Sequence, residues 1–443
     1  MPRGMRADGV EVRVSRKRGL TCGLVAGLAL ALAAPAAAAQ LERRGDGGTR
    51  ALWGALTAAE ARGELRGASI RPERYRPLEL AEDGLAVAFD RDELVLSLPH
   101  PDGGFQRFAL EETPVLEPDL AAKHPDIRTF TGTGVDDPSA TVHADLTPLG
   151  FHASVRSQDG WWYVDPSHHR GDDGVYLSYF GRDLENVRAP LFEPEEIEEM
   201  AHDVSRAAEE NGPAVTLRVY RLALVSDPSY ATFFGAGNVT AAKATLVSRV
   251  SQVYESESAI RLVLAAGNDA LNLNTPALAT AAGGPCGAEP CYTEDELAEC
   301  SGDTLYWTRI VIGQLLPGGA SSYDVGHIVL GVDGGGVAGL GVVGRSGKGR
   351  GCTGLPQPVG DFFAVDYVAH ELGHQFGANH TFNGTQGSCA GGNRSAANSV
   401  EPGSGSSIMA YAGICGSDNL QPHTDPYWSQ RSRQEIAAWV EVT

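Results

Sequence analysis

The feature that most constrains this chain is an eleven-residue segment with the pattern H-E-x-x-H-x-x-G-x-x-H. His370 and His374 are four residues apart, so on a helix both imidazoles lie on one face and can reach one metal ion. We expect Gly377 to adopt the positive φ that ends such a helix, which would bring His380 back as a third ligand and leave a fourth position open for water. Glu371 falls beside the histidines, and we expect it to act on that water and not to bind the metal. Five such positions coincide by chance in roughly one chain in 10⁴ to 10⁵ of this length, so the segment predicts a metal site.

Methionine, which the chain uses sparingly, recurs close to its end. Met409 is the only methionine after Met200, and it lies in a glycine-rich segment about thirty residues past His380. A single buried methionine is most often core filling. After the extended histidine pattern, however, the run Ser407–Tyr411 is typical of a Met-turn.

The stretch from Tyr323 to Val343 is apolar and unusually rich in glycine. Glycine weakens a strand and marks places where another backbone approaches closely. A substrate peptide lying along the edge of a sheet is such an approach. We therefore expect a substrate-binding edge strand within this stretch.

Together these features resemble the bacterial reprolysin-like metzincins, which are related to the adamalysin group. The resemblance extends from about residue 120 to the end and rests on the following segments: His370–His380, Ser407–Tyr411, Gly334–Gly341, Gly360–Asp366, Thr129–Gly132 and Gly150–Ala153. It implies an α+β fold, in which a β-rich pro-domain precedes a metzincin catalytic domain. That catalytic domain would be a twisted mixed sheet with an active-site helix and a Met-turn, cut by a cleft at a zinc ion.

The resemblance also assigns roles to single residues. It implies zinc ligands at His370, His374 and His380, a general base at Glu371, a methionine beneath the metal at Met409, and a substrate edge strand at Gly335, Gly336, Val337, Ala338 and Gly339. Thr381 departs from the pattern, because adamalysins usually have Asp directly after the third histidine. Tyr411 stands where astacins and serralysins place a tyrosine that can reach the metal. Our hypothesis is that it approaches the zinc or the oxyanion, and the alternative is a tyrosine packed under the turn.

The chemistry predicted for this site is hydrolysis of peptide bonds. Zinc on three neutral imidazoles lowers the pKa of its bound water and polarises a substrate carbonyl. Glu371 would take the proton of the water and pass it to the leaving amine. One alternative is an inactive zinc-binding adhesion or scaffold module of metzincin fold, against which the presence of Glu371 argues. The other is a metal-dependent hydrolase of non-peptide bonds.

The N-terminus indicates export. Basic residues precede an apolar run from Leu20 to Ala39 that ends in small residues, so residues 1–39 are interpreted as a signal peptide. The alternative is an uncleaved membrane anchor, because the run is long enough to span a bilayer. The formal net charge of −21 argues against a nucleic-acid partner. We expect a secreted monomer that acts on proteins or peptides and has no membrane attachment once the signal is removed.

Cysteine usage agrees with export. Cys22 lies inside the expected signal peptide, and the other six cysteines are Cys286, Cys291, Cys300, Cys352, Cys389 and Cys415. In an exported protein they predict up to three disulfides, with 15 possible pairings. The alternative is a second, cysteine-based zinc site, although the paired C-x₂-C spacing is absent.

Residues 40–212 are expected to form a β-rich propeptide with an acidic connector, and residues 213–443 the catalytic domain. The propeptide has strand-like runs at residues 85–89, 94–98, 141–146, 150–155 and 160–165. Since residues 40–285 contain no cysteine, we predict that a carboxylate or the His168–His169 pair blocks the metal in the precursor. Structural Ca²⁺ at Asp333, Asp361 and Asp366 is a further candidate, although surface carboxylates usually ligate nothing.

Overall fold

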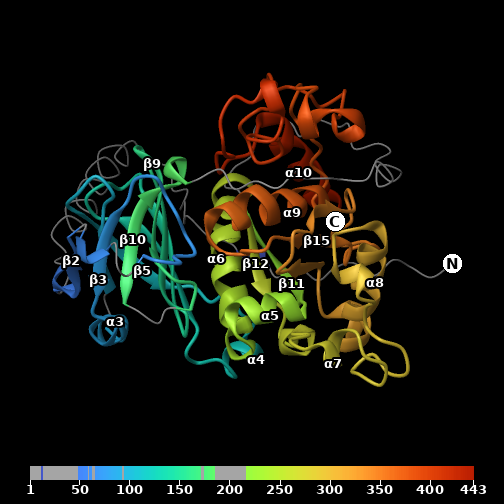
Figure 1. The fold of residues 1–443 in the computed structure, drawn as a ribbon, viewed down its shortest axis with the longest axis horizontal. Coiled ribbons are helices and arrows are strands. Elements are labelled where there is room, and N and C mark those ends of the chain that lie inside the picture. Colours follow the sequence, from blue (N-terminus) through green and yellow to red (C-terminus); the bar gives the residue numbers. More distant parts are fainter. Residues whose placement is uncertain are drawn as a thin grey trace, which may run out of the picture. The chain divides into compact units, whose positions relative to one another are not determined.

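The computed structural model describes residues 11–12, 48–57, 59–61, 65–91, 94–170, 174–184 and 216–443. The chain forms two compact units (Figure 1). The N-terminal unit comprises Val12–Thr113 and Arg128–Asp183, and the C-terminal unit comprises Met1–Glu11, Pro114–Ile127 and Leu184–Thr443. The expected signal peptide, apart from residues 11–12, and the acidic connector lie outside the described residues.

The N-terminal unit is a nine-stranded sheet in which every neighbouring pair is antiparallel. The strand order is β2-β3-β10-β9-β8-β7-β6-β5-β4. The bounds are β2 (Trp53–Ala55), β3 (Arg76–Leu80), β4 (Leu94–Pro99), β5 (Phe105–Glu112), β6 (Arg128–Gly134), β7 (Thr141–Thr147), β8 (Gly150–Ser157), β9 (Gly160–Pro166) and β10 (Val175–Phe180). The expectation of a β-rich N-terminal region is met, and its role as a propeptide stays a prediction.

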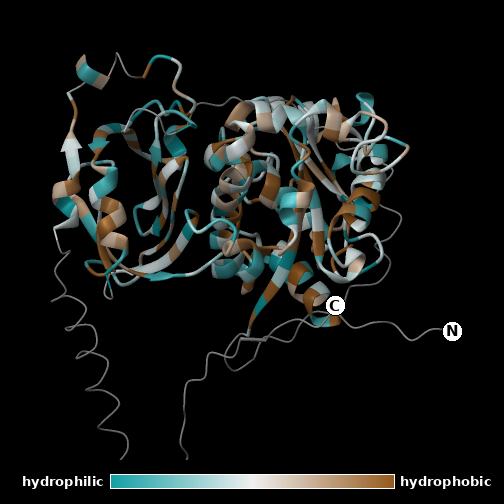
Figure 2. Cartoon of the chain, turned by 90° about the horizontal axis from the view of Figure 1, so that it is seen from below, coloured by the Kyte–Doolittle hydropathy of each residue, from teal (hydrophilic) through white to brown (hydrophobic). Residues whose placement is uncertain are grey.

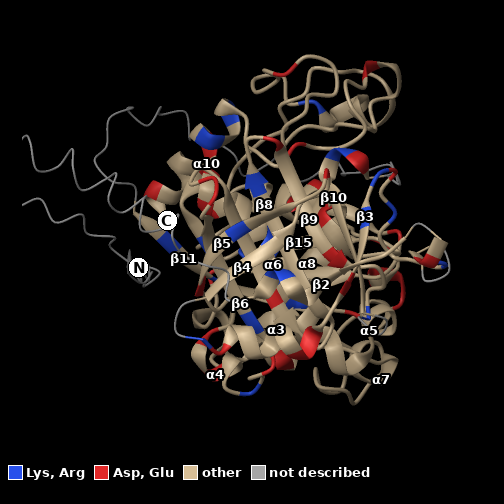
Figure 3. Ribbon diagram, turned by 90° about the vertical axis from the view of Figure 1, so that its left-hand side faces the viewer, with Lys and Arg blue, Asp and Glu red and all other residues tan. Residues whose placement is uncertain are grey.

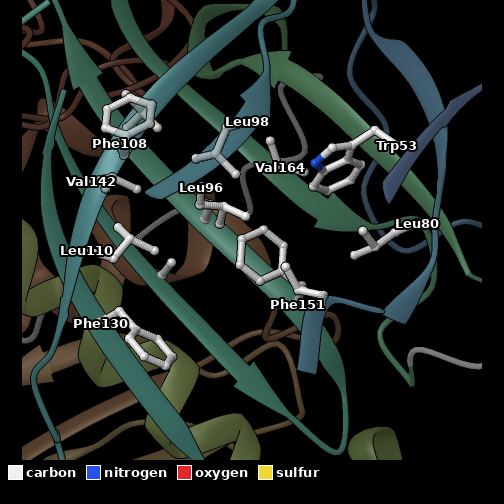
Figure 4. Close-up of a cluster of buried hydrophobic side chains, with 14 of the residues drawn as sticks. Trp53, Leu80, Leu96, Leu98, Phe108, Leu110, Phe130, Val142, Phe151 and Val164 are labelled. Carbon is white, nitrogen blue, oxygen red and sulfur yellow. The ribbon is translucent and has the colours of Figure 1, made fainter. Parts of the chain in front are cut away.

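One apolar core fills this sheet (Figure 4). Because successive side chains of a strand point to opposite faces, alternate residues supply the core: Val142 of β7 is opposite Val155 of β8, and Ala144 is opposite Ala153. The sheet curls, since the indole of Trp53 in β2 donates to the carbonyl of Ser97 in β4, at the other end of the strand order.

The prediction of a strand at residues 85–89 was wrong, because this run lies in helix α3 (Glu82–Phe89). All five residues are apolar, so a period of two cannot be told from a period of 3.6 by hydropathy. In the structure Leu85, Ala88 and Phe89 are buried, whereas Val87 is 64% exposed. This is the i, i+3, i+4 pattern of a helix with one buried face.

The C-terminal unit contains a mixed sheet of order β1-β11-β13-β15-β14, with β12 also paired to β11. The bounds are β1 (Glu11–Val12), β11 (Leu217–Ser226), β12 (Ile260–Leu264), β13 (Val325–Leu330), β14 (Gly335–Ala338) and β15 (Gly351–Gly354). Strand β11 is parallel to β12 and β13, and β13 is parallel to β15. Strand β14 ends the order and runs antiparallel to β15. The mixed sheet expected of the fold is therefore present.

Helices cover both faces of this sheet. They are α4 (Pro118–Ala121), α5 (Pro228–Phe234), α6 (Val239–Ser258), α7 (Pro276–Ala279), α8 (Gly302–Leu315), α9 (His370–Gln375) and α10 (Gln430–Val442). Helix α8 packs in one cluster with Val225 and Ile328, whereas Gln375 of α9 bonds to the side chain of His327, the adjacent residue of β13, on the other face. Figure 1 shows α6 and α8 on opposite sides of the strands, and in Figure 2 brown and teal residues share the same helices, as on amphipathic helices.

Residues Pro114–Ile127, which the sequence placed in the N-terminal domain, belong to the C-terminal unit. They run beside β12: Leu264 donates its N–H to Val115 at 2.7 Å and accepts from the N–H of Glu117 at 2.9 Å. The carboxylate of Glu117 also accepts from the N–H of Ala266. This segment therefore extends the β12 edge of the sheet, at the opposite end from β14.

All six cysteines outside the expected signal peptide are paired, as Cys286–Cys291, Cys300–Cys352 and Cys389–Cys415. The prediction of three disulfides is confirmed, and the cysteine-based zinc site is excluded because no thiolate remains to bind. Acidic and basic residues are interspersed along the ribbon of both units (Figure 3). Within the described ranges, no helix is both long and apolar enough to cross a bilayer.

Candidate metal centre

The first two histidines of the motif lie on α9, directly after a π-helical stretch over Phe362–Ala369. Segments of π-helix are frequent at functional sites. The hydroxyl of Tyr254 on α6 donates to the carbonyl of Ala369 at 3.0 Å and holds the junction. After α9 the chain turns at Gly377, whose φ of 91° is the positive value predicted from the sequence.

The structure brings the side chains of His370, His374 and His380 together around one point. The three Nε2–Nε2 distances are 3.1, 3.2 and 3.3 Å. Zinc–nitrogen bonds of about 2.0–2.1 Å in tetrahedral geometry place ligand nitrogens about 3.3 Å apart. All three residues are buried, and in the described part of the chain this is the only converging group of three or more histidine, cysteine or acidic residues.

The other nitrogen of each imidazole bonds to a backbone carbonyl. His370 Nδ1 lies 2.6 Å from Ile408 O, His374 Nδ1 lies 2.7 Å from Ala378 O, and His380 Nδ1 lies 2.6 Å from Asn393 O. A carbonyl only accepts, so each Nδ1 carries the proton and each Nε2 turns a lone pair towards the common point. Three lone pairs at this spacing repel one another unless a cation lies between them. The residues present therefore fit a metal ion.

Glu371 follows the first histidine and is fully buried. Its carboxylate lies against the backbone of Gly336 in β14, where a Cβ would fall 2.2 Å from Oε1. Any side chain at position 336 would therefore displace the carboxylate. Burial chiefly, and the charge of Glu371 secondarily, raise the pKa of the neighbouring Tyr254 phenol.

Met409 lies beneath α9. A Cβ on Gly373 would fall 2.5 Å from its sulfur, so the helix and the methionine are in direct contact. The backbone on either side is tied to the motif: Ile408 O accepts from His370, and Met409 O accepts from Thr381 N at 3.0 Å. The run Ser407–Tyr411, predicted to be a Met-turn, is thereby bonded to both ends of the histidine segment.

Tyr411 is buried beside the converging histidines. Its ring centroid lies 4.7 Å from that of His380 and 5.7 Å from that of His370, and it stacks on Phe382 at 4.6 Å. The ring is thus beside the metal centre, and the role of its hydroxyl stays a prediction.

A model of the family "Metallo-peptidase family M12B Reprolysin-like" matches residues 236–431. This part of the chain is reprolysin-like. The sequence resemblance to that group is therefore confirmed over these residues, and every residue of the candidate metal centre described above lies inside the match. The M12B family consists of metallopeptidases that depend on zinc, which agrees with a centre of three histidines.

The other comparisons add little. No curated protein matches the chain. Among solved structures, metalloproteinase-II from Bacteroides fragilis is similar over 80% of this chain and 94% of that chain, at 11% identity and a TM-score of 0.38. We infer nothing from a likeness of this size.

The structure also places the remaining predicted residues. Gly335 to Ala338 form β14, and Gly339 follows it. Asp333, Asp361 and Asp366 do not converge as a group of metal ligands among the described residues, so a calcium site there is not supported.

In the N-terminal unit, His168 Nδ1 bonds to Ser167 Oγ and His169 Nδ1 bonds to Ser69 Oγ. These bonds hold the pair to its own unit. Blocking of the metal by either side chain, or by a carboxylate, stays a prediction.

Several supporting residues were missed from the sequence because they lie far from the motif. Glu435 on α10 accepts from the N–H and the amide of Asn379, both at 2.9 Å, and so fixes the turn before the third histidine. His327 on β13 bonds to Gln375 at the end of α9. Glu401 bonds to Thr381 and to the start of the Met-turn. None of them has a spacing that signals a shared site.

Proposed function

We propose that the chain is a secreted zinc endopeptidase, made as a latent precursor whose residues 40–212 are the propeptide. The observation that carries this proposal is the convergence of three Nε2 lone pairs at 3.1–3.3 Å, with each Nδ1 proton held by a carbonyl. Such a set binds zinc and leaves one coordination position open, which is the arrangement of catalytic and not of structural zinc.

Zinc at this site would lower the pKa of a water molecule and polarise the substrate carbonyl. Glu371 would hold the proton that the attacking water loses and deliver it to the leaving amine. Burial of Glu371 against Gly336 holds its carboxylate beside strand β14. No covalent intermediate with the protein is needed, because the nucleophile is water.

The substrate would lie along β14. Among the described residues, this strand is at the end of the sheet order and has one paired side, towards β15. An extended peptide can add to such an edge through main-chain hydrogen bonds. Since Gly336 of this strand touches Glu371, a peptide bond held there would lie beside the proposed base.

The three disulfides and the N-terminal apolar run support export, because disulfides persist in oxidising compartments. Mass spectrometry of the N-terminus of the secreted protein tests this part. A mature chain that begins near residue 40 or later supports the proposal, and a chain retained in the membrane with residues 20–39 intact contradicts it.

Casein digestion tests the activity. Once residues 40–212 have been removed, the protein should digest casein, lose that activity with a chelator, and regain it with zinc, whereas the intact precursor should not cleave at the full rate. Glu371→Ala should bind one zinc ion but should not cleave. The alternative, an inactive zinc-binding module, predicts zinc binding without cleavage in the unaltered sequence, after removal of residues 40–212 as well as before.

A further inference from the structure

Glu401 connects two parts of the metal centre that are far apart in the sequence. Its Oε1 accepts from the N–H groups of Ser406 and Ser407 at 3.0 and 3.1 Å. Its Oε2 accepts from the hydroxyl of Ser407 at 2.5 Å and from the hydroxyl of Thr381. One carboxylate therefore receives four hydrogen bonds, two at each oxygen.

The backbone adds a second link at the same place. The N–H of Glu401 donates to the carbonyl of Thr381 at 2.9 Å, and Phe382 and Glu401 form an isolated parallel bridge. Gly405 has a φ of 65°, and a Cβ there would fall 3.1 Å from the Cδ of Glu401. The chain thus wraps closely around this carboxylate.

The two residues whose hydroxyl groups donate to Glu401 are next to residues of the metal centre. Thr381 directly follows His380, and its N–H donates to Met409 O. Ser407 directly precedes Ile408, whose carbonyl accepts from Nδ1 of His370. A shift of Thr381 or of Ser407 would therefore rotate an imidazole of the metal centre.

We infer that Glu401 is a positioning residue of the metal centre: its carboxylate sets the orientation of His370 and His380 by clamping Thr381 to the start of the Met-turn. This also gives a physical reason for Thr381, where related proteases have Asp. A threonine hydroxyl donates to a carboxylate supplied by Glu401, whereas a second carboxylate at position 381 would repel it. The inference rests on the zinc centre of the proposed function and not on the peptidase activity itself.

Zinc affinity is the readout, measured by competition with a fluorescent chelator. Glu401→Gln preserves the shape but removes the negative charge that strengthens all four bonds. Its NH₂ group either faces the two backbone N–H groups, so that both bonds are lost, or faces the two hydroxyls, which must then turn to accept instead of donate. Substitution of groups that orient metal ligands typically costs about 10–100-fold in metal affinity. We expect a loss of this size for Glu401→Gln and a smaller loss for Thr381→Val, and the double variant should lose less than the two single losses combined because the two residues share one interaction.

Glu255→Gln is the matched control. Glu255 also accepts two short hydrogen bonds, at 2.7 Å, but from Arg261. It should keep the zinc affinity of the unaltered protein, and its zinc-free form should melt within a few degrees of zinc-free Glu401→Gln.

Zinc affinity that stays within about twofold in both Glu401→Gln and Thr381→Val overturns the inference. If Glu401→Gln does not fold, Thr381→Val and Ser407→Ala decide the question by the same measurement. Failure of the proposed function would look different: the unaltered protein would bind zinc tightly and still cleave no peptide.

Discussion

The segment from His370 to His380 and the segment from Glu401 to Tyr411 both line the metal centre, but different interactions hold them. In the first, α9 sets the spacing of two of the three histidines, and His374 bonds to the carbonyl of Ala378 only four residues away. The second has no helix or strand. It is held by bonds to distant residues, such as Ile408 N to Tyr427 O at 3.1 Å.

The difference shows that one set of interactions brings the three imidazoles together and another set orients their rings. A helix and a glycine turn suffice to bring three imidazoles near one point, because spacing along the chain determines their positions. The tilt of each ring depends on the carbonyl that receives its Nδ1 proton, and two of these three carbonyls, at Ile408 and Asn393, are outside the motif. The first segment can therefore be recognised from a pattern, whereas the second requires the fold.

The largest effect should come from the first segment. In Glu371→Gln the side-chain amide cannot take up the proton of the water. We therefore expect kcat to fall by about 10²–10⁴-fold while one zinc ion stays bound. His374→Ala should lose the zinc as well as the activity. Zinc stoichiometry and peptide-hydrolysis rates of both variants distinguish base from ligand, and a Glu371→Gln variant with near-normal kcat would contradict the assignment.

The second prediction concerns the anchor that holds the end of α9 to the sheet. His327 bonds to Gln375 at 3.1 Å and to Thr353 at 2.8 Å, and burial lowers its pKa to about 4. The unfolded chain takes up this proton near pH 6.5, so stability is complete above that pH and is lost as the pH falls towards 4. At about 1.4 kcal/mol per pKa unit, the loss is about 3 kcal/mol.

Denaturant unfolding of the zinc-free protein between pH 7 and 4 measures this loss, because the ligand histidines then bind no metal in either protein. His327→Gln should show a shallower decline than the unaltered chain. Equal declines would mean that the protonation of His327 does not affect the stability of the helix anchor.

Particular residues show how far the sequence could predict this structure. The positions of the three histidines and the positive φ at Gly377 followed from spacing and from the backbone freedom of glycine. The number of disulfides followed from the cysteine count, but their pairing did not, because it depends on which loops meet in the fold. Glu401 could not be found, because it approaches Thr381 only through a long loop, and nothing in the spacing distinguishes it from a surface glutamate.

The third prediction tests the contact between the two segments. Gly373→Ala would place a Cβ 2.5 Å from Met409 Sδ and 3.2 Å from the ring of Trp428. Overpacking of this kind costs about 1–3 kcal/mol. The control is Gly313→Ala on α8, whose Cβ meets no atom within 4 Å and should stabilise the helix slightly. Thermal unfolding of both variants shows whether each substitution lowers or raises the stability. A Gly373→Ala variant as stable as the control would show that Met409 can move aside at little cost in free energy.

The smallest effect is expected at Tyr411, in the second segment. If its hydroxyl approaches the zinc or the oxyanion, Tyr411→Phe removes one hydrogen bond of about 1.4 kcal/mol, and kcat should fall about tenfold. Tyr292→Phe is the control, because Tyr292 is equally buried and donates to Thr308 in the core instead. An unchanged kcat in Tyr411→Phe would assign the ring to packing against His380 and Phe382. The second segment would then orient the ligands without contributing a group to the reaction.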